Sequence, residues 1–127
     1  MLAEARDRGN KVVYMVVYLS PGDYHRFHSP ANFTANFRRH ITGYLYSVNP
    51  SYLDIYKDVL KQNERVNLLG DWGHGFFGIS FVGATNVGSI VLNFDESVVT
   101  NHKRTRTAYT NDKDYTQKSE QEEYEEN

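Results

Sequence analysis

The densest group of reactive side chains in the sequence is Asp-Tyr-His-Arg-Phe-His at residues 23–28. His25 and His28 are three residues apart, and imidazole is the side chain best suited to move protons near neutral pH. The chain contains no cysteine, so neither a thiolate nucleophile nor a thiolate metal site is available. Any catalysis therefore depends on histidine, carboxylate or hydroxyl side chains.

Three interpretations of the histidine pair stay open from the residues alone. In the first, His25 and His28 ligate a metal together with Asp23, and His40 or His74 supplies a third imidazole. In the second, one imidazole is a general base for a hydroxyl nucleophile supplied from elsewhere, and the other donates a proton. In the third, both rings are loop residues whose hydrogen bonds are satisfied locally.

Other candidate site residues are weaker. The guanidinium groups of Arg38 and Arg39 match the geometry of phosphate, but charged residues also solvate the edge strand of a sheet. His74 stands between two glycines, where it could line a cleft or simply occupy a turn. The glycines within residues 82–89 lack the Gly-Lys-Ser/Thr ending of a phosphate loop, so they indicate close backbone packing between strands.

The hydrophobic pattern predicts the elements that must position these side chains. Residues 11–20 form a β-branched and aromatic run typical of a buried central strand, and Pro21 and Gly22 end it. The histidines then lie on a loop at residues 23–30. Further along, the pattern predicts one or two strands within 33–48, a helix over 51–63 with Ser51 as its N-cap, and strands at 66–69, 76–82 and 86–94.

The predicted fold class is therefore α+β, rich in mostly antiparallel strands with one helix. Residues 1–102 form the folded part, and residues 103–127 are expected to be a flexible, polar, acidic tail or insertion. Counted separately, residues 1–106 carry 12 basic and 9 acidic side chains, while the remainder is strongly acidic. No basic stripe with interleaved aromatic residues appears, so we do not expect nucleic acid as a partner. The longest apolar run, residues 12–19, is far shorter than the ~20 residues of a membrane span.

Several sequence blocks together resemble one family, the pyruvoyl-dependent phosphatidylserine decarboxylases, and most closely the mitochondrial-type eukaryotic proenzymes. The first block is YLSPGDYHRFHSP at residues 18–30. The others, in the same order and spacing, are RRH at 38–40, SVNP at 47–50, NERV at 63–66, GDW at 70–72, GFF at 75–77 and VGATNVGSI at 82–90. The resemblance covers about residues 12–102.

The resemblance implies a function and roles for the two histidines. In this family the proenzyme cuts itself once through an Asp-His-Ser relay, and the serine becomes a pyruvoyl group at the N-terminus of a small subunit. The second histidine of the block is the relay base, which corresponds to His28. The first belongs to the decarboxylation site, which corresponds to His25 as a proton donor or a phosphate contact. The implied partners are phosphatidylserine, the pyruvoyl-bearing small subunit and a membrane surface, with the mitochondrial inner membrane as the location.

The departures from the family pattern are also informative. The relay Asp and the Leu-Gly-Ser-Thr type motif that holds the pyruvoyl-forming Ser are absent from this chain, and Asp23 is not the relay Asp. We therefore expect a fragment of the large (beta) subunit that by itself neither cleaves itself nor decarboxylates. The alternatives are a non-catalytic lipid-binding remnant, a His-based metal hydrolase, or a fragment without function.

Overall fold

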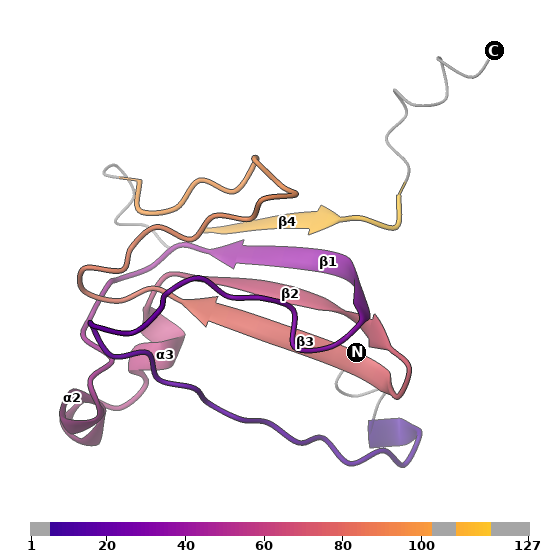
Figure 1. Ribbon diagram of the computed structural model, residues 1–127, viewed down its shortest axis with the longest axis horizontal. Coiled ribbons are helices and arrows are strands. Elements are labelled where there is room, and N and C mark those ends of the chain that lie inside the picture. The colour runs from indigo at the N-terminus through magenta and orange to yellow at the C-terminus, as the bar shows by residue number, and fades with distance from the viewer. Residues whose placement is uncertain (1–5, 103–108, 118–127) are drawn as a thin grey trace.

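The computed structural model describes residues 6–102 and 109–117, and its centre is one four-stranded antiparallel sheet (Figure 1). The spatial order of the strands is β3-β2-β1-β4. Their bounds are Phe33–Ile41 for β1, Arg65–Trp72 for β2, Gly75–Val82 for β3 and Thr110–Asp114 for β4. The predicted β-rich, mostly antiparallel α+β class is confirmed.

The pairing register gathers the core side chains on one face of the sheet. Val66 of β2 lies opposite His40 and Phe81, and Leu68 lies opposite Arg38 and Ile79. Paired residues share a face, because side chains alternate along each strand. That face therefore carries Arg38 and His40 of β1 beside the apolar residues of β2 and β3.

A close approach between β1 and β2 requires glycine at one position of the sheet. The register shifts between Ala35 and Phe37, where β1 carries an extra residue. A Cβ atom at Gly70, opposite this bulge, would lie only 1.8 Å from the carbonyl oxygen of Thr34. Only glycine lets the two backbones approach this closely at that position.

The helical region differs from the single helix predicted over residues 51–63. It consists of two short helices, α2 at Pro50–Ile55 and α3 at Val59–Gln62. The break begins at Tyr56, whose backbone is extended, and includes Asp58, whose φ of 65° lies in the left-handed region that a right-handed helix cannot accommodate. The predicted N-cap was also wrong, because the side chain of Asn49 caps α2 by accepting a hydrogen bond from the Ser51 backbone at 3.0 Å.

The prediction of a buried central strand at residues 11–20 is wrong. This segment forms no strand with any described residue, and Tyr14 and Met15 are 87% and 84% exposed. It runs outside β3 as an extended chain (Figure 1). A run of β-branched and aromatic residues indicates the tendency to form a strand, but the pairing partner must come from elsewhere in the fold, and the described residues do not provide one.

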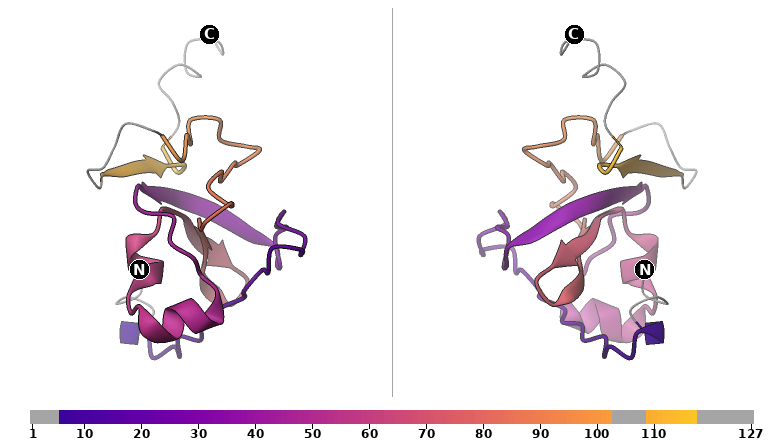
Figure 2. Two further views of the ribbon diagram at one scale, coloured as in Figure 1. Left: turned by 90° about the vertical axis from the view of Figure 1, so that its left-hand side faces the viewer. Right: turned by 90° about the vertical axis from the view of Figure 1, so that its right-hand side faces the viewer.

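Residues 84–102 cover the core face without forming the strand predicted at 86–94. Their backbone makes only isolated bridges, Ala84 to Val87 and Leu92 to Asp95. Ile90, Leu92 and Val98 nevertheless pack on the β2 side chains to complete the buried cluster. In the side views of Figure 2, this coil and the two helices lie on opposite sides of β1.

The part of the chain expected to be a flexible tail contributes a strand. β4 pairs with β1 over five positions, from Phe37 opposite Asp114 to Ile41 opposite Thr110. All five of its residues are exposed and polar, so the strand carries no hydrophobic signal. Residues 103–108 and 118–127 of the predicted tail lie outside the described residues.

A buried carboxylate connects β1, the 84–102 coil and β4. Asp95 Oδ2 lies 3.2 Å from Arg38 Nε, and both side chains are only 1% exposed. The same carboxylate accepts hydrogen bonds from Ser97 and Lys113, at 2.5 and 3.1 Å, and from the Tyr115 hydroxyl. The possible roles of Arg38 in phosphate binding or in solvating an edge strand therefore do not hold, because its guanidinium group is buried in an ion pair.

These bonds determine how the cluster titrates. Burial by itself would raise the pKa of Asp95, but the hydrogen bonds from Ser97, Tyr115 and Lys113 outweigh it and hold the pKa of the carboxyl far below its usual range. Burial and the contact with Asp95 raise the pKa of Tyr115 to about 12. The carboxylate is therefore charged, and the phenol neutral, over the whole physiological range.

The substitution Asp95→Asn should lower the free energy of unfolding by about 3–5 kcal/mol, because it leaves the buried Arg38 charge unpaired. The matched control is Asp112→Asn, which breaks the exposed pair of Asp112 with Arg39 and should cost less than about 1 kcal/mol. Urea unfolding of both variants measures the difference. Equal effects would show that the buried pair does not hold the sheet and the coil together.

Acidification should destabilise the fold through the same carboxylate. Because the folded state depresses the pKa of Asp95, the stabilisation is complete above the ordinary Asp value of ~3.9 and is lost as pH falls below it. The free energy of unfolding, measured between pH 6 and pH 2, should therefore decline below about pH 4. Asp95→Asn should flatten this decline, and an unchanged pH profile in that variant would contradict the assignment.

Candidate active site

The block of residues 23–28 lies on a loop, as the sequence pattern predicts, and its residues are exposed. The loop follows the exposed extended segment of residues 11–20, so the expected buried strand before it is missing. It then crosses the sheet towards the first residue of β1, Phe33 (Figure 1). The candidate catalytic side chains are therefore open to solvent and to any group that approaches from outside.

One aromatic contact anchors this loop to the sheet. The rings of Phe27 and Phe81 are stacked with their centroids 3.6 Å apart. Phe81 in turn packs against the buried cluster that contains Val66 and Leu68. Phe27, which lies directly before His28, thus fixes the histidine relative to the core. The composition of the block does not single out Phe27, although the alternation of Phe77, Ile79 and Phe81 does predict an apolar face for it to contact.

A tight turn shapes the start of the block. Asp23 accepts hydrogen bonds from both the backbone nitrogen and the hydroxyl of Ser20, each at 2.8 Å. The Ser20 hydroxyl, then its backbone N–H, and to a smaller extent the charge of His25 lower the pKa of Asp23 below its usual value. Asp23 is therefore a charged turn residue, and its carboxylate is engaged by Ser20.

The two histidines are held in different ways. His28 Nε2 lies 2.8 Å from the Tyr24 hydroxyl, and the two rings stack with their planes 5° apart. His25 Nδ1 lies 2.7 Å from the backbone carbonyl of Asp23. A carbonyl can only accept a hydrogen bond, so Nδ1 of His25 carries a proton and donates it, which leaves Nε2 as the ring atom available to other groups.

The other histidines considered as metal ligands do not join the block. His40 is buried, and its Nε2 lies 2.8 Å from Glu64 Oε1. His74 sits in the β2–β3 turn with its ring edge against Trp72. Across residues 6–102 and 109–117, no three His, Asp or Glu side chains gather in a group that could hold a metal ion. The described structure therefore offers no third ligand to His25 and His28.

The arginine pair divides between two environments. Arg38 is buried in the core, and Arg39 points outward to a two-pronged contact with Asp112 at 2.7 and 2.9 Å. The Asp112 hydrogen bond raises the pKa of Arg39 above its usual value. Neither guanidinium group lies free beside the histidine block in this structure.

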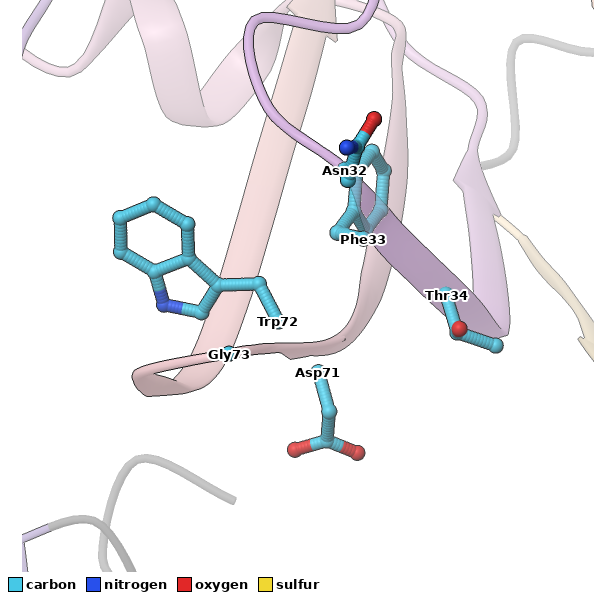
Figure 3. A pocket seen from close by; sticks show the side chains of 6 residues that line it. All are labelled: Asn32, Phe33, Thr34, Asp71, Trp72 and Gly73. Atoms are coloured by element: carbon cyan, nitrogen blue, oxygen red, sulfur yellow. The ribbon is translucent and has the colours of Figure 1, made fainter.

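A hollow of about 510 Å³ in the described surface is not lined by any residue of the histidine block. Its walls come from the start of β1 and the end of β2, as Figure 3 shows. The lining residues are Asn32, Phe33, Thr34, Asp71, Trp72 and Gly73. The histidine loop and this hollow are therefore separate features.

Comparison with known proteins assigns the chain. A family model described as phosphatidylserine decarboxylase matches residues 1–123. The chain therefore belongs to the phosphatidylserine decarboxylase family. The match extends beyond residues 12–102, the stretch in which the sequence blocks of the family occur.

Individual members of the phosphatidylserine decarboxylase family are about half identical to the chain. The mitochondrial phosphatidylserine decarboxylase proenzyme of Pongo abelii is 51% identical over 104 residues, which are 82% of this chain and 25% of that protein. The rat enzyme of the same name is 54% identical over 93 residues, or 73% of this chain and 23% of that protein. The mitochondrial phosphatidylserine decarboxylase proenzyme 1 of Saccharomyces cerevisiae is 52% identical over 93 residues, which are 73% of this chain and 19% of that protein. The chain thus spans a quarter or less of the length of these curated relatives.

Removing the Tyr24 hydroxyl should change the hydrogen bonding of His28 and leave that of His25 unchanged. In Tyr24→Phe, His28 loses its hydrogen-bond partner at Nε2, whereas the bond of His25 to the Asp23 carbonyl does not involve Tyr24. The ¹⁵N resonances of the imidazole rings report these bonds directly. We expect the Nε2 signal of His28 to move and the signals of His25 to stay in place, and movement of His25 alone would contradict this geometry.

Proposed function

We propose that this chain supplies the histidine-bearing part of a phosphatidylserine decarboxylase active site. In this proposal His28 is the base of the self-cleavage relay, and His25 serves the decarboxylation step. The observation that carries the proposal is the hydroxyl held 2.8 Å from His28 Nε2, on an exposed loop fixed to the core by Phe27. This is the distance and the atom type that a serine nucleophile presents to its general base.

Tyr24 occupies the position that the serine hydroxyl requires. For His28 to take the serine proton, the Tyr24 hydroxyl must release Nε2, and the other ring nitrogen must face the acid that orients the imidazole. Within the described residues, the hydrogen-bond partner of His28 is Tyr24. The relay Asp and the serine both belong to family sequence blocks that this chain does not contain. The loop is open to solvent, so both groups can approach from outside the chain.

The orientation of His25 suits either of its two proposed tasks. Nδ1 is occupied by the Asp23 carbonyl, so Nε2 faces outward. As an imidazolium ion, His25 can deliver a proton from Nε2 to the carbon that has lost its carboxylate. The same charged N–H can instead donate a hydrogen bond to a lipid phosphate oxygen. The hydrogen bond to Asp23 keeps the ring in one orientation for both tasks.

The proposed cofactor is a covalent pyruvoyl group derived from a serine outside this chain. When present, such a group withdraws electrons from the amino acid headgroup while carbon dioxide leaves. The donors present here fit this chemistry, because an exposed imidazole with an available ring nitrogen can return the missing proton. Holding that imidazole in place is the contribution of the chain itself.

The proposed partners follow from the relatives. The relatives are named proenzymes, which implies processing into more than one piece. We propose a small pyruvoyl-bearing subunit as the second piece, phosphatidylserine as the substrate and a membrane surface as its source. The relatives are also named mitochondrial, and the mitochondrial inner membrane is the proposed location. No helix among residues 6–102 and 109–117 is long and apolar enough to cross a bilayer.

A chimeric proenzyme separates the roles of the two histidines. Residues 12–102 of this chain replace the matching segment of the rat enzyme, which is 54% identical over 93 residues. We expect His28→Ala to slow self-cleavage by about 10²–10⁴, because the serine loses its base. His25→Ala should leave cleavage intact and lower phosphatidylethanolamine formation by a similar factor. Gel electrophoresis follows cleavage, and radiolabelled phosphatidylserine follows decarboxylation.

The exposed His102 provides the matched control for that experiment. His102→Ala should change neither step. Normal cleavage in the His28→Ala chimera would refute the relay assignment, and normal decarboxylation in the His25→Ala chimera would refute the second role.

A further inference from the structure

The β2–β3 hairpin presents a half-exposed tryptophan at one end of the sheet. Trp72 pairs with Gly75, and Gly73 and His74 form the two-residue turn between them. Gly75 has a φ of 109°, a conformation that side-chain-bearing residues rarely adopt, so this tight turn depends on glycine. The indole of Trp72 is 37% exposed, at the hairpin end visible at the right of Figure 1.

Aromatic neighbours hold this indole rigid although it is exposed. The ring of Trp72 lies 4.8 Å from that of His74 and 5.4 Å from that of Phe77. Phe33 extends the group through a contact of 4.8 Å with Phe77. Beside them is the hollow of about 510 Å³, with Trp72 on one wall and Phe33 on another, while the Asp71 side chain points away from both rings (Figure 3). The surface therefore combines a rigid aromatic edge with room for a small polar group.

A basic segment lies beside the same hairpin end. A Cβ atom built on Gly75 would lie 3.8 Å from the side-chain nitrogen of Asn10, which places residues near Asn10 at the turn. Within residues 6–11 the chain carries Arg6, Arg8 and Lys11 against the acid Asp7. All four side chains are exposed, and none of them joins an ion pair within the described residues.

The geometry points to the hairpin tip and this basic segment as the surface that contacts an anionic lipid bilayer. Tryptophan is the side chain best suited to the interface, since its ring is apolar and its N–H remains hydrated at headgroup depth. Each nearby Lys or Arg adds attraction to anionic lipid. The lipid headgroup enters the hollow beside Trp72. This inference rests on the proposed function only in expecting a phosphatidylserine-containing membrane.

The exposed aromatic face of the helical region lacks this charge complementarity. Ile55, the last residue of α2, and Tyr56, which follows it, are 72% and 54% exposed. Their basic side chains are balanced by acids, and Lys61 forms an ion pair with Asp58 at 3.0 Å. An apolar patch without net positive charge gains little from an anionic surface, so the hairpin end is the favoured contact.

The test uses the emission of Trp72, the only tryptophan in the 127-residue chain. Vesicles of phosphatidylcholine containing phosphatidylserine should shift the emission to shorter wavelength, and brominated phosphatidylcholine in those vesicles should quench it. Vesicles of phosphatidylcholine alone should have much smaller effects. The charge reversal Arg8→Glu with Lys11→Glu should weaken the apparent vesicle affinity by about tenfold or more.

The double reversal Lys57→Glu with Lys61→Glu, on the helical face, is the matched control and should change affinity less than about twofold. Circular dichroism confirms that each variant is folded. An unshifted Trp72 emission while the chain sediments with the vesicles would overturn the proposal, as would equal losses from the two reversals. Absence of binding to any vesicle would overturn it too. None of these outcomes depends on self-cleavage or turnover, so they leave the proposed function to its own test.

Discussion

The buried contact between Arg38 and Asp95 is the interaction on which the rest of this structure depends. The apolar core is small: among residues 6–102 and 109–117, its buried members are Val66, Leu68 and three residues of the 84–102 coil. A charged pair in such a core is tolerated only when its remaining hydrogen-bonding groups are satisfied. Ser97, Lys113 and Tyr115 satisfy the carboxylate. Strands β1 and β4 and the 84–102 coil are thereby held together.

The candidate site depends on that face through a single aromatic contact. Phe27 stacks on Phe81, and Phe81 packs on the cluster that the 84–102 coil completes. The histidines beyond this anchor keep their local hydrogen bonds, to Tyr24 and to the Asp23 carbonyl, and remain open to solvent. A fixed but open pair of imidazoles suits an enzyme whose nucleophile, acid and cofactor arrive on other parts of the protein. The chain spans a quarter or less of its relatives, which agrees with such a division of the site.

The sequence predicted best those elements whose signal is local. The alternation of Phe77, Ile79 and Phe81 identified β3, and the loop at residues 23–30 followed from Pro21 and Gly22. The segment at residues 11–20 failed because strand tendency does not guarantee a partner. The helix prediction missed the left-handed residue Asp58, which no periodic pattern reveals.

Non-local interactions account for the other differences. β4 has the polar sequence TNDKD and is held by backbone pairing with β1 and by the ion pairs of Asp112 and Lys113, contacts that join residues more than fifteen positions apart. The same limit applies to the site. The block of residues 23–28 was identified by its chemistry and by family resemblance, but the Phe27 anchor and the Tyr24 contact to His28 required the structure. Arg38 looked like a surface cation because sequence alone does not pair it with Asp95.

The central claim is that this histidine loop can serve a self-cleaving decarboxylase once the rest of the enzyme surrounds it. The most direct measurement is the intact mass of the unmutated chimera that carries residues 12–102 of this chain in the rat enzyme. We expect two polypeptides, the smaller beginning with a pyruvoyl group where the proenzyme has serine. A folded chimera that remains one uncut chain, while the rat enzyme itself is processed under the same conditions, would contradict it.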